Sequence, residues 1–501
     1  MRLILVIDGG TTAFKAAVFD ESLRVLGLAN REFDIEHPQP GQSELDADAY
    51  WSACVEAVRH ALHSAEIDPQ QIAAVAVTSH TDTLFALDAS GRPVGKAILW
   101  TDPRAQQQAD DIQHRFGLEQ LFHLTGQTGA SSVHFASRLA WFLQQQPRET
   151  ERVRYFLQTQ DFLLYRLSGQ AALDHTIASC SLLGYLEQRG YWREMLDVLG
   201  IAEETLSRII AAGEVAGTLT AEAAHAMGLP KDIPVVAGAM DAVAAQLALG
   251  NRRAGMVTEI TGAALVIGAT CDAPTFDAQM RVPCFAHAIP DKYLLLPWCE
   301  TAGSALQWYR NQFFAPWVQD SAHLYEMITA EAAEVPAGSD GVLVLPHFAG
   351  SGSPDFNPEA RAAILGLTLA HQRKHISRAL LESIAFLLQR NLDLLAEMGV
   401  PITQLVSAGG GSKSALWCRI KADVTGYPVV TMDVPEATAT GAALLAGQAM
   451  DWWTLDSAPP VGDPERAITY HPRQEVHGQY SEAYRRFLQY EALMTQSYLN
   501  R

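Results

Sequence analysis

Paired cysteines, long apolar runs and surplus positive charge are all missing from this sequence. Its six cysteines are scattered over 501 residues and none stands in a CxxC pair, which argues against a zinc site. Such spacing is typical of reduced thiols, so we expect a cytoplasmic protein. No apolar run reaches the ~18 residues of a membrane span, because the best candidate, 233–249, contains Asp241. The N-terminal apolar run stops at Asp8, too early for a signal peptide.

Basic residues are outnumbered, with 36 Lys and Arg against 56 Asp and Glu, a net charge of −20. This charge repels nucleic acids and anionic membranes, so we expect neither as a partner. An anionic small ligand would need a local site built from backbone N–H groups, helix N-termini or a metal ion. With 48% hydrophobic and 18% charged residues, the chain is a folded globule, and its length predicts two or more domains.

Two parts of the chain share a layout of apolar strand, small-residue turn with threonine, and apolar strand. The first covers residues 3–19, and the second is VTEITGAALVIG, centred on Thr261 and Gly262. Helical periodicity marks 46–64, with Asp46 as N-cap, and long helices are predicted at 371–398 and 475–498. The pattern predicts a duplicated α/β architecture of mixed sheets covered by helices.

The first turn, DGGTT followed by Lys15, has the composition of a phosphate-binding loop. Glycines such as Gly10 allow a close backbone approach, and Thr11, Thr12 and Lys15 supply hydroxyl and ammonium donors. Asp8 could hold Mg²⁺, which prefers one or two carboxylates together with phosphate oxygens. The alternative is a tight hairpin whose glycines serve only the turn.

Asp241 stands alone after a Gly/Ala turn, in AGAMDAVAAQ. A carboxylate at the start of a helix is most often an N-cap. The functional alternative is a general base that accepts the proton of a substrate hydroxyl during phosphoryl transfer.

A second glycine turn lies at 408–412. Gly409, Gly410 and Gly411 end a predicted strand, and Ser412 or Ser414 can cap the helix that follows. Bare backbone there would accommodate an adenine or a ribose, although a simple strand–helix turn has the same composition.

Polar and aromatic side chains gather at two further strand ends, at 79–88 and 98–105. His80, Asp82 and Trp100 offer the planar polar groups and aromatic face that bind sugars. The alternative is structural, with Asp102 and Arg104 as a surface ion pair and Trp100 in the core.

In combination these motifs resemble the FGGY carbohydrate kinase family, which includes xylulokinases, glycerol kinases, ribulokinases and L-fuculokinases. The resemblance runs from about residue 3 to residue 450. Its most specific parts are DGGTT…K, WTDPR at 100–104, Asp241, the stretch LPHFAGSGSPDFNPEARAAILGLTLAH at 345–371 and GGGSKSALWCRIKADVTGYPV. It implies two ribonuclease-H-like (actin-like ATPase) domains with a cleft between them, at residues 1–243 and 244–501.

The resemblance also implies roles for the motif residues. Asp8–Thr12 would be the first phosphate loop with Asp8 near Mg²⁺, Asp241 the general base, Thr261 and Gly262 the second phosphate loop, and Gly409–Ser412 the adenosine site. The implied ligands are ATP, Mg²⁺ and a small sugar or polyol, and family members are often homodimers.

The chain departs from the family pattern at three places. Ile260 stands where a glycine usually precedes the threonine of the second phosphate loop, Thr81-Asp82 replaces the usual substrate dipeptides, and Ala242 replaces the glutamine of glycerol kinases. These changes favour a ketose, a deoxysugar or a sugar alcohol rather than D-xylulose or glycerol. Two alternatives stay open: an actin-like ATPase switch, and a weakly active sugar sensor suggested by Ile260.

Overall fold

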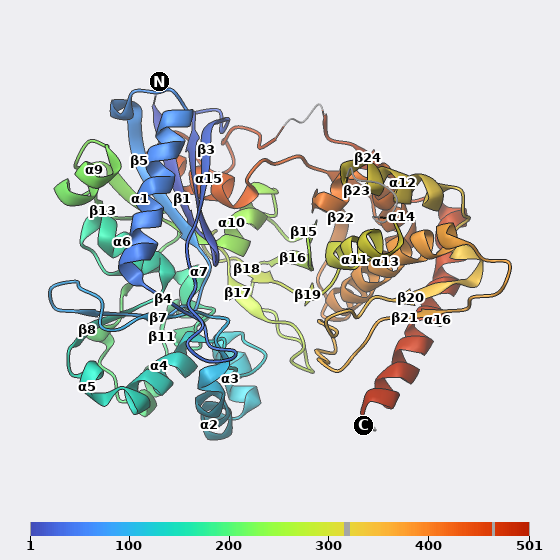
Figure 1. Ribbon diagram of the computed structural model, residues 1–501, viewed down its shortest axis with the longest axis horizontal. Helices are drawn as coiled ribbons and strands as arrows, with labels where there is room; N and C mark the ends of the chain where they lie inside the picture. The colour runs from blue at the N-terminus through green and yellow to red at the C-terminus, as the bar shows by residue number, and fades with distance from the viewer. Residues whose placement is uncertain (1, 315–320, 463–465, 500–501) are drawn as a thin grey trace.

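The computed structural model describes residues 2–314, 321–462 and 466–499 as two lobes, each built on one mixed sheet (Figure 1). The sheet of the N-terminal lobe has six strands in the order β13-β14-β5-β1-β2-β3. These strands are β1 (Leu3–Gly9), β2 (Ala13–Phe19), β3 (Val25–Glu32), β5 (Ile72–Ser79), β13 (Val215–Thr218) and β14 (Pro234–Met240). β1, β5 and β14 run parallel, whereas β1–β2–β3 form an antiparallel meander.

Strand β1 is buried on both faces, as its continuous apolar sequence predicts. Leu3, Leu5 and Ile7 pack toward one core, and Ile4 and Val6 pack toward another. Helices cover the first core: α1 (Ala47–Ser64), α6 (Thr159–Ser168) and α9 (Ala221–Met227). The second core is covered by α10 (Asp241–Ala248) and α15 (Ala437–Ala449).

The C-terminal lobe repeats this plan in an eight-stranded sheet, β17-β18-β16-β15-β22-β23-β24, with β19 paired to β16. Its strands are β15 (Gly255–Thr261), β16 (Leu265–Cys271), β17 (Cys284–Ala286), β18 (Tyr293–Leu295), β19 (Trp298–Cys299), β22 (Ile402–Gly409), β23 (Val429–Thr431) and β24 (Thr469–Tyr470). As in the first lobe, a hairpin, β15–β16, lies beside parallel strands, β22 and β23. Its helices are α11 (Gly303–Phe313), α12 (Ser321–Ala333), α13 (Arg373–Glu397), α14 (Ala415–Thr425) and α16 (Gln474–Leu499).

Smaller elements surround the two sheets. In the N-terminal lobe they include β4 (Glu44–Leu45), β6 (Phe85–Asp88), β7 (Ala97–Ile98), α2 (Gln106–Phe116), α3 (Leu118–Thr125), α4 (Phe135–Gln145), α5 (Pro147–Thr150), β8 (Val153–Leu157), β9 (Ala172–Asp174), α7 (His175–Ala178), β10 (Gly184–Tyr185), β11 (Gly190–Tyr191), α8 (Arg193–Leu199) and β12 (Arg208–Ile210). In the C-terminal lobe β20 (Leu343–Leu345) pairs with β21 (Ala363–Leu365).

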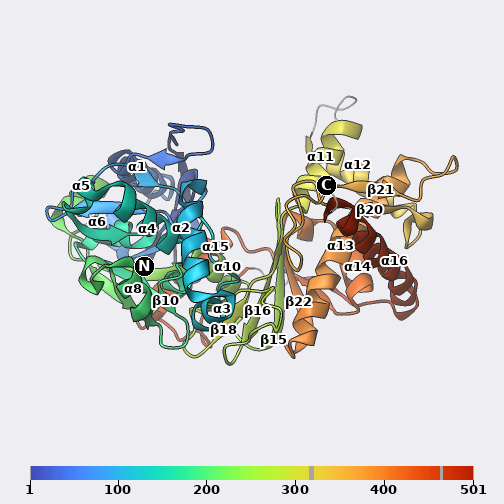
Figure 2. The ribbon, with the colours of Figure 1, turned by 90° about the horizontal axis from the view of Figure 1, so that it is seen from below.

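Helix α15 comes late in the chain but packs against β1, β5 and β14 of the first sheet, beside α10 (Figures 1 and 2). The two helices touch backbone to backbone. A Cβ atom at Gly441 of α15 would lie 1.9 Å from the carbonyl oxygen of Ala244 on α10. The C-terminal half therefore completes the core of the N-terminal lobe, and the boundary at residue 243 stays a prediction.

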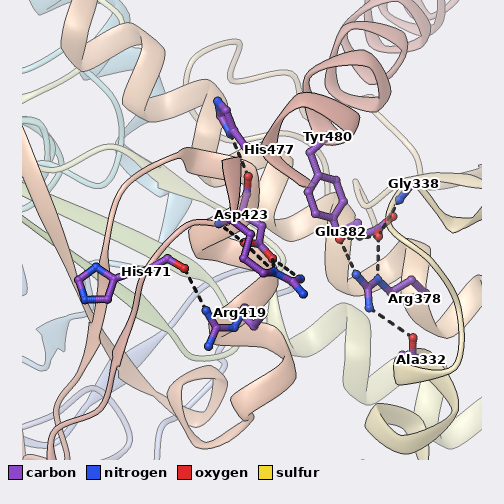
Figure 3. Close-up of polar contacts among 10 residues, drawn as sticks. Ala332, Gly338, Arg378, Glu382, Arg419, Asp423, His471, His477 and Tyr480 are labelled. Atoms are coloured by element: carbon purple, nitrogen blue, oxygen red, sulfur yellow. Dashed lines mark hydrogen bonds and ion pairs between the residues drawn. The ribbon is translucent and has the colours of Figure 1, made fainter. Parts of the chain in front are cut away.

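Charged side chains of α13 and α14 hold the terminal helix α16 and the residue before it, Arg473 (Figure 3). Arg378 of α13 binds Glu382 at 2.7 Å, and the hydroxyl group of Tyr480 on α16 contacts both side chains. Asp423 of α14 binds Arg473 at 2.6 Å and accepts a bond at its carbonyl oxygen from the His477 ring.

Most predicted elements are confirmed. Asp46 caps α1 through bonds from the N–H groups of Asp48 and Ala49, and the helices predicted at 371–398 and 475–498 are α13 and α16. Within the described ranges, none of the helices combines the length and the apolarity that crossing a bilayer requires.

The close contact of α10 and α15 yields a prediction about stability. Gly441→Ala should lower the free energy of unfolding by about 2–4 kcal/mol, because the added methyl group meets rigid backbone. Gly478→Ala is the matched control: Gly478 lies in α16 with nothing near its missing Cβ, so that variant should gain about 0.5–1 kcal/mol. Urea unfolding of both variants measures the difference, and equal stabilities would contradict the packing described.

Candidate active site

Three parallel strands of the first sheet end at one edge, and each end carries a polar side chain. Asp8 is in β1, His80 follows β5, and Asp241 follows β14. The register sets Asp8 beside Thr78, and Met240 beside Ser79. Because the carboxyl ends of parallel strands share an edge, residues far apart in sequence meet there.

Asp241 is the first residue of α10 and caps nothing further along the helix. Its Oδ1 accepts a bond from the N–H of Ala242 at 2.6 Å, and no described residue bonds its Oδ2. Burial raises the pKa of Asp241 to about 6. The carboxylate therefore keeps one oxygen for a ligand and a pKa near neutrality, which suits a proton acceptor.

Asp8 lies close enough to Asp241 to feel its charge. Burial, and then the negative charge of Asp241, raise the pKa of Asp8 to about 7. Lys15, on the paired strand β2, binds Glu436 at 2.9 Å. Glu436 directly precedes α15, so this ion pair joins the first hairpin to a helix from the other half of the chain.

The predicted phosphate loop is the turn between β1 and β2. The N–H of Gly10 bonds the Ala13 carbonyl at 3.1 Å, and a Cβ at Gly10 would meet that oxygen at 2.6 Å. Thr11 accepts a bond from the indole N–H of Trp100 at 2.9 Å. Trp100 is thus half-buried, and its indole N–H is engaged by Thr11. This bond connects the loop after β7 to the hairpin.

The prediction that His80 grips the sugar is not supported by its surroundings. The ring is buried, its Nδ1 bonds the Gly9 carbonyl at 2.8 Å, and its Nε2 contacts the hydroxyls of Thr83 and Thr159. Burial lowers the pKa of His80 to about 4. A neutral imidazole with both nitrogens engaged supports the loop and has nothing left for a substrate.

Asp82 has a left-handed backbone, with φ of 68°. Burial raises the pKa of its carboxyl group. Its Oδ1 accepts from the N–H of Phe135 at 2.9 Å, and its Oδ2 from Thr81 at 2.8 Å and the Cys180 thiol at 3.3 Å. Arg138, fully buried, donates to the carbonyls of Asp82, Leu99, Trp100, Asp102 and Val133. This arginine holds the loops after β5 and β7 together.

Asp102 and Arg104 follow the structural alternative, although they are buried rather than on the surface. Their side chains pair at 2.7 Å, and Asp102 also accepts from the N–H of Ser43. Arg104 extends the pair to Glu44 at 2.7 Å.

A second site lies in the other lobe, in a cavity of about 920 Å³. Its walls come from the β15–β16 turn, the glycine turn after β22, and helices α11 and α12. The lining residues include Thr261, Gly262, Gly303, Ser304, Gln307, Tyr325, Glu326, Thr329, Gly410, Gly411, Lys413, Leu416 and Trp417. Residues of the predicted second phosphate loop, Thr261 and Gly262, and of the predicted adenosine site, Gly410 and Gly411, line the same cavity, and their roles stay predictions. Ser414, rather than Ser412, caps α14.

The role of Thr261 in a phosphate loop stays a prediction, but its hydroxyl group is engaged within the protein. It is almost fully buried, and its hydroxyl donates to Glu259 at 2.7 Å and accepts from Lys421 at 2.9 Å. Ile260 lies in strand β15, paired with Val266, and not in the turn. A β-branched residue suits that strand, so the argument for a degenerate sensor loses its structural basis.

Sequence reasoning missed the walls that α11 and α12 contribute. Gln307, Tyr325 and Glu326 stand on amphipathic helices without a motif, and only the tertiary fold brings them to the glycine turns.

No cluster of three metal-ligating side chains occurs in the ranges that the structure describes. The carboxylate of Asp8 nevertheless fits Mg²⁺, which keeps most of its water ligands and needs only one or two carboxylates.

Comparisons with known proteins agree with this architecture. The N-terminal domain of the FGGY family of carbohydrate kinases matches residues 3–248, and its C-terminal domain matches 262–450. A glycerol kinase of Thermococcus gammatolerans is 31% identical over 462 residues, 90% of each chain. A probable L-xylulose kinase of Haemophilus influenzae is 28% identical over 498 residues, 98% of this chain and 99% of that one.

Solved structures repeat the two-lobed fold. A xylulose kinase from Rhodospirillum rubrum superposes with a TM-score of 0.91 at 26% identity, over 99% of this chain and 100% of the other. A gluconate kinase from Lactobacillus acidophilus has a TM-score of 0.90 at 23% identity, covering 100% and 99%, and shows the fold alone. The chain belongs to the FGGY family of carbohydrate kinases, phosphotransferases with an alcohol group as acceptor.

Proposed function

We propose that this kinase moves the γ-phosphate of ATP to a hydroxyl group of a small, neutral sugar or polyol, with Asp241 as the general base. The observation that carries the proposal is the edge where β1, β5 and β14 end. It presents Asp241 with one oxygen unengaged and a pKa near 6. Such a group accepts the hydroxyl proton as the oxygen attacks phosphorus in line.

The nucleotide would bind in the other lobe, with its adenosine in the cavity lined by Gly410, Gly411 and Trp417. Its phosphates would lie toward the backbone N–H groups of the two hairpin turns, which supply donors without requiring net positive charge. Mg²⁺, held by Asp8 directly or through water, would neutralise charge on the phosphates. Closure of the lobes would exclude water, the competing acceptor.

The charges around Asp241 favour a neutral substrate. Asp8, Asp82 and Asp241 gather at strand ends of one sheet, while the cations near them are engaged: Lys15 binds Glu436, and Arg138 binds five carbonyl groups. A carboxylate on the substrate would meet these acids without a counter-ion. The relatives named for glycerol and xylulose fit this expectation better than the gluconate kinase does.

A cytoplasmic location is part of the proposal, supported by six cysteines that all carry free thiols. A homodimer stays a prediction.

Substrate charge can be tested with a matched pair. ADP release with Mg·ATP should rise when neutral ketoses or polyols are added. The rate with glucitol should exceed the rate with gluconate, which has the same chain length and one added negative charge. A preference for gluconate would contradict the neutral-substrate proposal, and sugar-independent release throughout would contradict the kinase assignment.

Asp241→Asn should lower kcat by about 10²–10⁴-fold, the usual contribution of a general base. The amide keeps the side-chain volume but cannot accept the proton. ADP affinity, measured by calorimetry, is the control and should stay near the wild-type value because the adenosine cavity lies in the other lobe. Normal turnover by a folded variant would remove Asp241 from the mechanism.

The same variant should be more stable than the wild type at pH 8, by about 3 kcal/mol. The pKa of Asp241 is raised from 3.8 to about 6 by folding, so the folded chain binds the extra proton between those values. The stabilisation is complete below pH 3.8 and is lost as the pH rises through 6. Urea unfolding from pH 4 to pH 8 should show the wild type losing stability relative to Asp241→Asn, and parallel profiles would contradict the raised pKa.

A further inference from the structure

A fully buried ion pair lies beneath the nucleotide cavity. Lys421 on α14 and Glu259 on β15 are both 0% exposed, and the Lys421 Nζ lies 2.5 Å from the Glu259 Oε1. Ser407, at the neighbouring position on β22, donates to the same oxygen. The pair joins a helix and a strand that are 162 residues apart.

Stability alone is a poor explanation for this pair. Removing two charges from water costs several kcal/mol per ion, and replacement of a buried pair by apolar side chains is often neutral or stabilising. Leu405 and Trp417 show that apolar residues are available around it in this core. The pair is therefore better explained by the residue that it holds in position.

What it holds is Thr261, the last residue of β15. Lys421 donates to the Thr261 hydroxyl at 2.9 Å, and that hydroxyl donates to the second oxygen of Glu259 at 2.7 Å. The hydroxyl group of Thr261 thus accepts from one charged group and donates to another. Hydrogen bonds to charged groups are stronger than those between neutral groups.

Thr261 in turn contacts two of the cavity walls, the β15–β16 turn and the glycine turn after β22. The Gly262–Ala264 turn follows it directly, and the glycine turn after β22 rests against it. A Cβ on Gly409 would lie 2.7 Å from the Thr261 carbonyl oxygen, and one on Gly411 would lie 2.6 Å from the Thr261 Cβ. A shift of Thr261 would move the two backbone segments that line the cavity.

Lys421 also lies near Trp417, a lining residue on α14. Its Nζ lies 5.1 Å from the ring centroid of Trp417, within range of a cation–π contact, and Trp417 lines the cavity.

We propose that Lys421, together with Glu259, is a positioning residue for the nucleotide: it fixes Thr261, and through Thr261 the two turns that receive ATP. This inference rests on the proposed nucleotide site and adds a specific device to it. Because the pair is neutral overall, it acts by geometry and not by attracting the phosphates.

The test is the double variant Glu259→Gln with Lys421→Met, which removes both charges and keeps the side-chain lengths. The KM for Mg·ATP and the Kd for ADP should rise about tenfold, the effect of losing one charge-assisted hydrogen bond, while the KM for the sugar stays within about twofold. The matched control is Arg378→Met with Glu382→Gln, which removes another buried pair of this lobe (Figure 3). The hydrogen bonds of that pair run to Ala332, Gly338, Ser339 and Tyr480, and these residues do not line the cavity.

Each result is decisive. Unchanged ADP affinity in the folded double variant would overturn the inference, and so would an equal loss in the control. If the double variant does not fold, Thr261→Val replaces it: loss of ADP affinity that Thr261→Ser restores supports the inference, and unchanged affinity in Thr261→Val overturns it. Wild-type protein that binds no ADP would instead refute the nucleotide site itself.

Discussion

The backbone contact between α10 and α15 is the constraint on which the site depends. Gly441 leaves no room for even a methyl group against the Ala244 carbonyl, so the two helices have one mutual position. Asp241 begins α10, and Glu436, the partner of Lys15, directly precedes α15. One packing contact thus positions Asp241, the proposed general base, places the charge beside the first hairpin, and attaches the C-terminal half of the chain to the N-terminal sheet.

In the proposed nucleotide site, backbone N–H groups rather than cations would bind the phosphates of this acidic chain's nucleotide. At the edge that carries Asp241 the chain does the opposite of what stability favours, because Asp8 and Asp241 lie half-buried near each other and both pKa values are raised. A fold optimised for stability alone would neutralise or separate them. The energetic cost marks the edge as functional, because a base with a pKa near neutrality requires that burial.

Much of the framework was predictable from sequence because it rests on local patterns: apolar strands, glycine turns and the Asp46 cap. The roles of individual side chains were less so. His80 looks like a sugar ligand until Gly9 and Thr83 occupy its ring, and Thr261 looks like a phosphate ligand until Lys421 and Glu259 occupy its hydroxyl. Gly9 and Lys421 are distant in sequence from the residues that they engage, and the cavity walls on α11 and α12 carry no motif at all.

The two hairpins occupy equivalent places in their sheets, yet different chemistry holds each one. Neutral groups support the turn of the first hairpin, with Trp100 bonded to Thr11 and His80 to the Gly9 carbonyl, while its ion pair, Lys15 with Glu436, is partly exposed. A lysine–glutamate pair holds the second through Thr261. The first hairpin already lies beside Asp8 and Asp241. A further buried charge there would change the raised pKa values of these two carboxylates. The second has no such neighbours among its bonded partners, so an ion pair there can supply rigidity without altering the pKa of the base. The two lobes therefore share the backbone hairpin beside parallel strands, while different side chains support the turn of each.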